Sequence, residues 1–503
     1  MKIVGFMYMN YKKNYKYFLF IVPILYLIVS LFSLPQVGLG WDTSVNLAKG
    51  EQVYIFLKTL NVTYLKDYPN LTSKYFLEVP GFSNGHPTSS SFLSFVTGNL
   101  LIDVFGFKYY FFHIFNIILS FSFLYFFGQF VYKYFSLVKE NVKKKLIVSL
   151  FTQLFVISIP YFLIYSLSDI KDLPVLAFSF FSFYFLYEIN NKNYRVNYIL
   201  FLLFFVLALY SKFSLIFLLP LFIYVLIIQV LKYKSTFKLN KKYFLITGLL
   251  ILFVLTFIFW PQLIFNFKYE FSRVLFLYID TPILKSGTVP LYVDLIYSTP
   301  LILIFIFIFS VRNFILFQKK RNIILVCIWV FPVLLYSIIS HNYYEGLRQF
   351  LFLIVPLSLV VASFIIDKGI HENMYVFVIM ILFLMFLFMT PLHKIGYTNI
   401  LQNKNYIKND NWGLSLPYGV EYVKTNYADK KVYYSPANFL LKYYNFSNFE
   451  YISTNLVDAQ VLITVPNNYW YESEKKDREL YFVKTKTFYA GDRVVIEIWE
   501  KGG

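Results

Sequence analysis

Residues 40–44 read Gly-Trp-Asp-Thr-Ser and residues 85–87 read Gly-His-Pro, within a stretch that extends from Gly40 to Gly106. The first motif directly follows an apolar segment at 17–34, and the second precedes an apolar run at 92–105. A carboxylate therefore stands where one apolar segment ends, and a histidine stands before the next apolar run. This arrangement predicts that both polar groups are held at one face of a membrane.

The composition excludes an ordinary soluble domain. Of the 503 residues, 58% are hydrophobic, 22% are aromatic and only 15% are charged, which is typical of a polytopic membrane protein. The net charge of +19 would suit nucleic acid if the lysines formed one basic face, but they lie in short clusters between apolar runs. We therefore expect topogenic charge and anionic lipid headgroups as partners, and no nucleic acid. A single cysteine, Cys327, excludes an internal disulfide and a CxxC metal site.

The hydropathy pattern predicts about eleven membrane-spanning helices, each long enough to cross about 30 Å of hydrocarbon. The run at 92–105 is too short to cross, and we interpret it as a re-entrant or interfacial helix in a long first loop at 38–107. The first span lacks the short core and small-residue exit of a cleaved signal peptide, which indicates an anchor. The predicted spans are 17–34, 108–132, 146–166, 173–189, 196–211, 213–231, 243–262, 292–311, 323–340, 348–366 and 374–391.

The distribution of lysine and arginine predicts the orientation. Twenty-one of them lie in one set of alternate loops, from Lys2 near the amino terminus to Lys368, whereas the opposite short loops hold six. The positive-inside rule places the lysine-rich set, and with it the amino terminus, in the cytoplasm. An odd number of spans then places the first loop and the carboxy-terminal tail outside, in a cell membrane or, in a eukaryote, the endoplasmic reticulum.

From about residue 392 the composition changes to that of a soluble protein. Residues 417–427 form an amphipathic pattern, and four segments carry the β-branched and aromatic residues typical of strands: 431–435, 461–465, 481–488 and 493–499. The expected architecture is an all-α transmembrane domain at 1–391 followed by a small external α/β domain at 392–503.

Two candidate site residues belong to the opening stretch. Asp42 is either a loop carboxylate that faces water or a general base that activates an acceptor hydroxyl or amine, because a carboxylate can accept a proton and hold partial positive charge on a sugar. His86, which precedes a proline, is either a loop cap or a donor to a phosphate or leaving group. Ionisable residues near a membrane are costly, so such positions are functional candidates.

The remaining candidates lie at the outer ends of later spans. Asp172, which follows Asp169 and precedes Pro174, could cap a helix N-terminus. Lys212 is flanked by apolar residues and either extends to the interface or binds an anion. Arg348 begins a late span and either extends to the interface in the same way or donates two bonds to a phosphate. No acidic pair with metal-ligand spacing is present, so we expect chemistry without a metal.

Together these positions give the external face a carboxylate, a histidine and two cations that could meet in one cavity. Such a set suits the removal of a group from a lipid phosphate. Nucleotide sugars and ATP are not generally available outside the cytoplasmic membrane or in a lumen. A transferase at this face would need a donor that arrives in the membrane, and a polyprenyl-phosphate sugar fits.

The chain resembles the integral-membrane GT-C glycosyltransferases, in particular the branch that contains protein O-mannosyltransferases and the aminoarabinose transferases that modify lipid A. The resemblance covers nearly the whole chain and rests on the order of loose motifs. Thr43 stands where many members have Glu, and only one proline follows His86. The motifs are Asp42, His86-Pro87 with the run to Phe105-Gly106, Asp172-Leu173-Pro174, Lys212, Arg348-Gln349 to Pro356, and Asp410-Asn-Trp-Gly413.

The resemblance implies a glycosyltransferase that uses a polyprenyl- or dolichyl-phosphate sugar as co-substrate and no other cofactor. It implies that Asp42 activates the acceptor, that His86, Lys212 and Arg348 hold the donor phosphate, and that the reaction is a single inverting displacement. Asp172 and Tyr344 are expected to contact substrate. The sequence leaves the sugar and the acceptor, which could be a protein, a glycan or a lipid, unspecified.

Two other classes remain open at this point. A transporter or flippase of a lipid-linked saccharide would also carry sparse polar residues in a helical bundle, although transporters usually show internal repeats or broken helices. A non-catalytic subunit could use the external domain to bind a partner.

Overall fold

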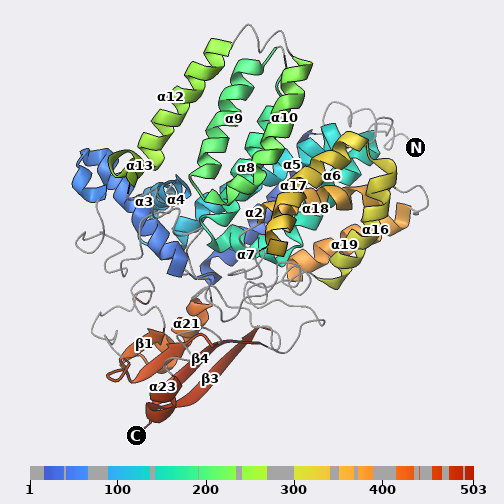
Figure 1. Cartoon of the computed structure of the whole chain (residues 1–503). Coiled ribbons are helices and arrows are strands. Elements are labelled where there is room, and N and C mark those ends of the chain that lie inside the picture. Colours follow the sequence, from blue (N-terminus) through green and yellow to red (C-terminus); the bar gives the residue numbers. More distant parts are fainter. Residues whose placement is uncertain are drawn as a thin grey trace.

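The computed structural model divides into a large helical part and a small sheet domain that contains the carboxyl terminus (Figure 1). The element α21 lies between the two in this view. The residues that the structure describes are 16–38, 41–65, 89–135, 142–190, 192–233, 241–268, 300–339, 351–366, 372–388, 415–435, 441, 456–466, 475–490 and 493–502.

The helical part follows the apolar runs of the sequence closely. It contains, in chain order, α2 (Ile21–Ser33), η1 (Leu34–Gln36), α3 (Trp41–Thr59), η2 (Val62–Leu65), α4 (Ser89–Phe105), η3 (Tyr109–His113), α5 (Ile114–Phe130), η4 (Val131–Phe135), α6 (Val142–Ile157), α7 (Pro160–Ser168), α8 (Asp172–Tyr187), α9 (Tyr194–Leu209), η5 (Phe213–Leu218), α10 (Leu219–Lys232), α12 (Lys241–Phe259), α13 (Pro261–Phe265), α16 (Leu301–Phe317), α17 (Lys320–Ile339), α18 (Ile354–Ala362), η8 (Ser363–Ile366) and α19 (Glu372–Phe388).

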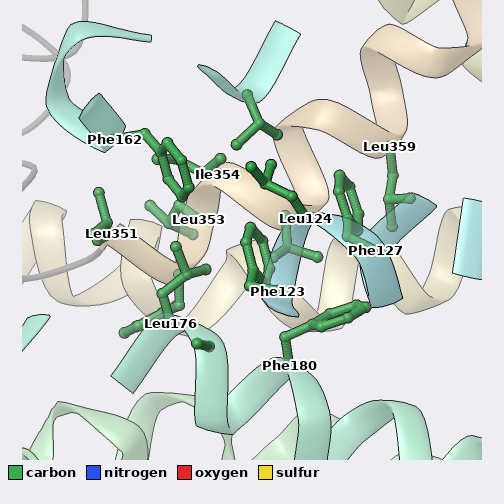
Figure 2. Packing of buried hydrophobic residues seen from close by; sticks show 14 of the residues in the cluster. Phe123, Leu124, Phe127, Phe162, Leu176, Phe180, Leu351, Leu353, Ile354 and Leu359 are labelled. Carbon is green, nitrogen blue, oxygen red and sulfur yellow. The ribbon is translucent and has the colours of Figure 1, made fainter. Parts of the chain in front are cut away.

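The core of the bundle is built from aromatic side chains on α5 and α8. Phe123 and Phe127 of α5 meet the ring of Phe180 on α8 edge to face, with centroid distances of 5.3 and 5.5 Å. Leu359 of α18 lies near Phe127 in the same packing (Figure 2). Aromatic pairs in this geometry add to the gain from apolar burial, so α5, α8 and α18 are held as one unit.

The helices identify the chain as an integral membrane protein. In the described part of the chain, four helical segments are long and apolar enough to cross a membrane: Lys16–Gln36, Tyr109–Lys133, Phe213–Lys232 and Lys242–Phe259. Six further apolar helices have 10–17 residues. The count of eleven spans therefore remains a prediction, whereas the predicted bundle of apolar helices is confirmed.

The span predicted at 146–166 is bent, because it is divided into α6 and α7, which meet at an angle of 68°. Pro160 occupies the first turn of α7, and Ile159 before it has an extended backbone with ψ of 116°. A residue before proline avoids helical backbone dihedral angles, and proline has no N–H group to donate the hydrogen bond that would continue α6. The break directs α7 toward the turn at 169–172.

The first loop contains two helices, where the sequence predicts one. Besides α4, which includes the predicted run at 92–105, the 19-residue helix α3 occupies Trp41–Thr59. The two helices lie side by side, and a Cβ placed on Gly50 of α3 would stand 2.3 Å from the carbonyl oxygen of Ser91 on α4. Only glycine permits this approach, so Gly50 sets the distance between the two helices.

The predicted α/β character of the C-terminal domain is confirmed. Its elements are α21 (Leu416–Asn426), β1 (Val432–Ser435), β2 (Val461–Thr464), α23 (Lys475–Tyr481), β3 (Phe482–Ala490) and β4 (Arg493–Lys501). The sheet order is β1-β2-β4-β3, in which β1 and β2 are parallel and the other two pairs are antiparallel. The helix α23 is an addition to the prediction.

The helix α21 connects this domain to the bundle. Leu416 and Val420 of α21 belong to the same buried apolar cluster as Leu47 of α3 and Ile170 of the turn before α8. The hydroxyl of Tyr418 also contacts the side-chain oxygen of Gln36 at 3.3 Å. The sheet domain therefore sits over the end of the bundle where α3 and the 169–172 turn lie.

Candidate functional site

A buried ion pair joins two of the predicted site residues. The ammonium of Lys212 contacts the Oδ1 atom of Asp172. The Asp172 side chain is 2% exposed and that of Lys212 is 18% exposed, so the carboxylate is interior and the cation lies at the edge of the site. Asp172 begins α8, whereas Lys212 follows the end of α9 in an extended conformation with φ of −164°. The packing of α8 on α9 brings the two residues together.

The turn before α8 is held by Asp169. Its Oδ1 atom accepts hydrogen bonds from the amides of Lys171 and Asp172, both at 2.7 Å. Asp172 is the first residue of α8 and its carboxylate contacts Lys212, while Asp169 binds the amides of the turn, so a capping role for Asp172 stays a prediction. A carboxylate that accepts two amide bonds fixes the conformation of the turn.

Two side chains near the start of α5 support the same turn. The amide of Asn116 donates to the carbonyl oxygen of Asp169. His113 is fully buried and lies close enough to Asp169 for an electrostatic interaction with it. Within the part of the chain that the structure describes, neither ring nitrogen of His113 has a hydrogen-bond partner. The Asp169 turn is thus contacted from α5 as well as from its own chain.

The helix α3 reaches the turn from the other side. The hydroxyl of Thr43 donates to the carbonyl oxygen of Ser168 at 2.8 Å, which places the first turn of α3 beside the end of α7. The backbone of Asp42 belongs to this first turn. In a helix, positions 42, 46 and 49 share one face because they are four and three residues apart. Asn46 and Lys49 on this face are buried.

The start of α4 is anchored beside Lys212. The amide of Ser89 donates to the carbonyl oxygen of Tyr210 at 2.9 Å. The hydroxyl of Ser89 donates to the carbonyl oxygen of Leu207 at 2.9 Å and lies 3.0 Å from the hydroxyl of Ser211. Ser211 is the residue before Lys212, so α4 begins next to the ion pair. The hydroxyls of Ser90, Ser91 and Ser94 are buried and have no hydrogen-bond partner among the described residues.

The structure thus brings together four segments that are far apart in the sequence: the starts of α3 and α4, the 169–172 turn, and the residues after α9. Asp172 and Lys212 are in contact, and the backbone of Asp42 lies near them. His86, Tyr344 and Arg348 lie outside the described residues.

Sequence reasoning missed the contributions of Asn46, Lys49, Ser89 and Asn116. The spacing of positions 42, 46 and 49 is the signal that could have identified Asn46 and Lys49. It predicts one face of a helix, but the run is polar enough to be interpreted as a loop.

The chemistry of the site follows from its charges. The ammonium of Lys212 has three N–H donors, and among the described residues its partner is Asp172. It therefore retains donors for an anion at the exposed edge of the site, while Asp172 holds it in place. Within the described residues, no group of three or more His, Cys, Asp and Glu side chains has an arrangement that could hold a metal ion.

No protein-family model matches the chain, and neither does any curated protein. Solved structures with a similar overall fold include ArnT from Cupriavidus metallidurans in the apo state, with 12% identity and a TM-score of 0.48 over 95% of this chain and 97% of that chain. ArnT from the same organism bound to undecaprenyl phosphate has 11% identity and a TM-score of 0.46, over 94% and 97% of the two chains.

Proposed function

We propose that the chain is a membrane-embedded glycosyltransferase that moves a sugar from a polyprenyl-phosphate donor to an acceptor at the site described above. The observation that supports this most directly is the convergence of separate motifs. Thr43 contacts Ser168, Asp172 contacts Lys212, and Ser89 is anchored at Ser211. Four motifs of the family resemblance therefore meet at one end of the bundle: those of Asp42, His86, Asp172 and Lys212.

The donor phosphate is assigned to the side of the site where Lys212 lies. Its partly exposed ammonium can donate to a phosphate oxygen while Asp172 fixes its position. His86 is three residues before the anchored Ser89, so the chain between them spans at most about 10 Å. His86 can therefore contribute to the same phosphate, and Arg348 is proposed as the second cation, because its planar guanidinium donates two parallel bonds.

The acceptor is assigned to the side where α3 begins. Asp42 is the proposed base, since its backbone lies in the first turn of α3 beside the 169–172 turn. Asp172 and Tyr344 are proposed to orient the substrates. The residues do not distinguish a protein, glycan or lipid acceptor, and the donor sugar could be a hexose or a pentose.

The proposed reaction is one inverting displacement. The acceptor nucleophile forms a bond to the anomeric carbon as the bond from that carbon to the phosphate oxygen breaks. The electron pair leaves with the polyprenyl phosphate, and the proton of the nucleophile passes to the carboxylate of Asp42. Lys212, with His86 and Arg348, stabilises the charge that develops on the phosphate, at roughly 3–4 kcal/mol per donor. The reaction is proposed to proceed without a metal.

A transporter of lipid-linked saccharides is the second candidate, and the bend between α6 and α7 favours it. Broken helices bind substrates in transporters, usually near the middle of the membrane. Here the ion pair lies instead at the start of α8, and helix α7 separates it in the sequence from the break. A transporter would move the intact donor, whereas the proposed enzyme releases free polyprenyl phosphate.

The test is the substitution Asp42→Asn, with Asp103→Asn on α4 as the matched control. Membranes that contain the chain are supplied with a panel of polyprenyl-phosphate sugars, and both the release of polyprenyl phosphate and the transfer of sugar are measured. Loss of a general base should lower transfer about 10²–10⁴-fold in the first variant, while the control keeps the wild-type rate. An Asp42→Asn variant that transfers sugar at the wild-type rate would contradict the assignment.

A further inference from the structure

The end of the bundle opposite the candidate site carries a cluster of cations. Asp172 begins α8, and Tyr187 ends it about 24 Å away along the 16-residue helix. Around this far end lie Lys232 at the end of α10 and Arg321 in the first turn of α17. These three residues define a cluster that we call the Tyr187 cluster. It is distant from the site proposed above and independent of it.

Helix packing fixes the members of the Tyr187 cluster. The guanidinium of Arg321 lies 5.0 Å from the centroid of the Tyr187 ring, and the ammonium of Lys232 lies 4.9 Å from the centroid of Tyr233. Both cations are close enough to Tyr187 to interact electrostatically with its hydroxyl. The buried side chain of Gln229 donates to the carbonyl oxygen of Tyr187 at 2.7 Å, which joins the ends of α8 and α10.

The Tyr187 cluster lacks a matching anion among the described residues. Glu188, the next residue in the sequence, also interacts electrostatically with Tyr187, but its ion pair is with Lys133, at 2.9 Å. In the described ranges, neither Lys232 nor Arg321 forms an ion pair. Arg321 also stands at the positive end of the dipole of α17, a helix of 20 residues. Helix packing therefore places two positive charges, those of Lys232 and Arg321, near the same tyrosine, where they repel one another unless an anion binds between them.

A second observation points to the same ligand. Gln318, three residues before Arg321, is buried; its side-chain oxygen accepts a hydrogen bond from Asn322 at 3.1 Å, and its side-chain nitrogen has no partner among the described residues. This nitrogen is a donor in need of an acceptor. The first turn of a helix also presents backbone N–H donors. The start of α17 therefore combines backbone N–H groups, the side-chain amide of Gln318 and the guanidinium of Arg321 next to Lys232.

The surface next to the Tyr187 cluster is apolar. On α10, Ile227 is 52% exposed and Leu231 is 72% exposed, and Ile324 of α17 is also exposed. These residues follow the two helices away from the cations toward the middle of the membrane. An anion with attached acyl chains can therefore place its charge at the cations and its chains on this surface.

We propose that the Tyr187 cluster binds the phosphate of an anionic phospholipid in the leaflet at this end of the bundle. Each Lys or Arg near an anionic membrane surface contributes on the order of 1 kcal/mol, which corresponds to about fivefold in affinity. A site with two converging cations should therefore distinguish an anionic lipid from a zwitterionic lipid by roughly 25-fold. The hydroxyl of Tyr187 can add a hydrogen bond to the same phosphate.

The experiment measures lipid binding to the whole chain in detergent. Phosphatidylglycerol and phosphatidylcholine with identical acyl chains are titrated separately, and binding is followed by native mass spectrometry and by the shift in thermal unfolding. The wild type should bind phosphatidylglycerol roughly 25-fold more tightly. The double variant K232Q/R321Q should lose this preference, and R321K should retain most of it because the charge remains.

The matched control is Arg195→Gln. Arg195 is a cation at the same end of the bundle that lies over the rings of Tyr194 and Tyr243, at 5.6 and 5.5 Å. This variant should keep the preference for phosphatidylglycerol. The proposal is overturned if the wild type shows no preference, if K232Q/R321Q keeps it, or if Arg195→Gln lowers it equally. It is also overturned if inorganic phosphate alone reproduces the unfolding shift, since a soluble anion would then suffice.

Discussion

Replacement of Lys212 by Met is the sharpest test of the ion pair. The variant keeps the length of the side chain but leaves the carboxylate of Asp172 without its cation in an environment where it is 2% exposed. Removal of one partner from a buried pair typically costs about 3–5 kcal/mol. The Lys212 side chain is itself 18% exposed, so we expect the lower end, about 3 kcal/mol, or roughly a hundredfold change in the unfolding equilibrium.

The double variant D172N/K212M separates stability from activity. Asn at position 172 removes the uncompensated charge, so the double variant should regain most of the lost stability, to within about 1 kcal/mol of the wild type. Transfer should not recover, because the phosphate would still lack the donor at position 212. A lost donor of this kind lowers the rate by about 10²–10³-fold.

Both quantities can be measured on the purified full-length chain in detergent. Unfolding can be followed through tryptophan fluorescence during a titration with a denaturing detergent, since Trp260 and Trp329 are buried in the bundle. Sugar transfer from the lipid-linked donor gives the activity. The reasoning fails if Lys212→Met unfolds like the wild type, and the functional assignment fails if D172N/K212M transfers sugar at the wild-type rate.

Two further predictions concern the α3–α4 contact and metals. Gly50→Ala should lower transfer and destabilise the chain by about 1–3 kcal/mol, because the new Cβ would meet the backbone of Ser91 at 2.3 Å. Gly248→Ala on α12 is the control, because there the atom nearest to the new Cβ is the hydroxyl of Tyr198 at 3.3 Å. This variant should be as stable as the wild type or more stable. Equal losses of stability in the two variants would contradict the packing argument. A chelator such as EDTA should leave the transfer rate unchanged, and a rate that falls with EDTA and returns with added Zn²⁺ or Mg²⁺ would refute the metal-free reaction.

Hydropathy predicted much of the fold because burial in lipid restricts a chain to helices. The described helices α2, α5, α9 and α10 and the strands β1–β4 extend no more than two residues beyond the predicted spans and strand segments. Hydropathy could not reveal the bend at Pro160, because both arms of that span are equally apolar. A local signal was present, however, since proline disfavours a helical conformation in the residue before it.

Helix α3 was missed for a different reason. Its 19 residues include Asp42, Asn46, Lys49 and Glu51, so it lacks the apolar face by which a helix at a core or an interface is recognised. Several of its polar residues are buried instead of exposed. Only the tertiary structure supplies the partners that make such burial acceptable, and one of them, the carbonyl oxygen of Ser168 that binds Thr43, lies more than a hundred residues away.

Burial of polar residues on α3 has a cost that must be offset nearby. Buried charges need polar partners, and Lys49 and Glu51 are both about 3% exposed. The other side of α3 supplies apolar contacts, since the ring of Phe56 lies 5.8 Å from that of Phe257 and 5.7 Å from that of Phe265. Gly50 then brings the polar face against α4. The position of Asp42 is therefore determined by contacts within the protein and not by the depth of the membrane surface. A change of bilayer thickness should accordingly lower the transfer rate less than the single methyl group added by Gly50→Ala.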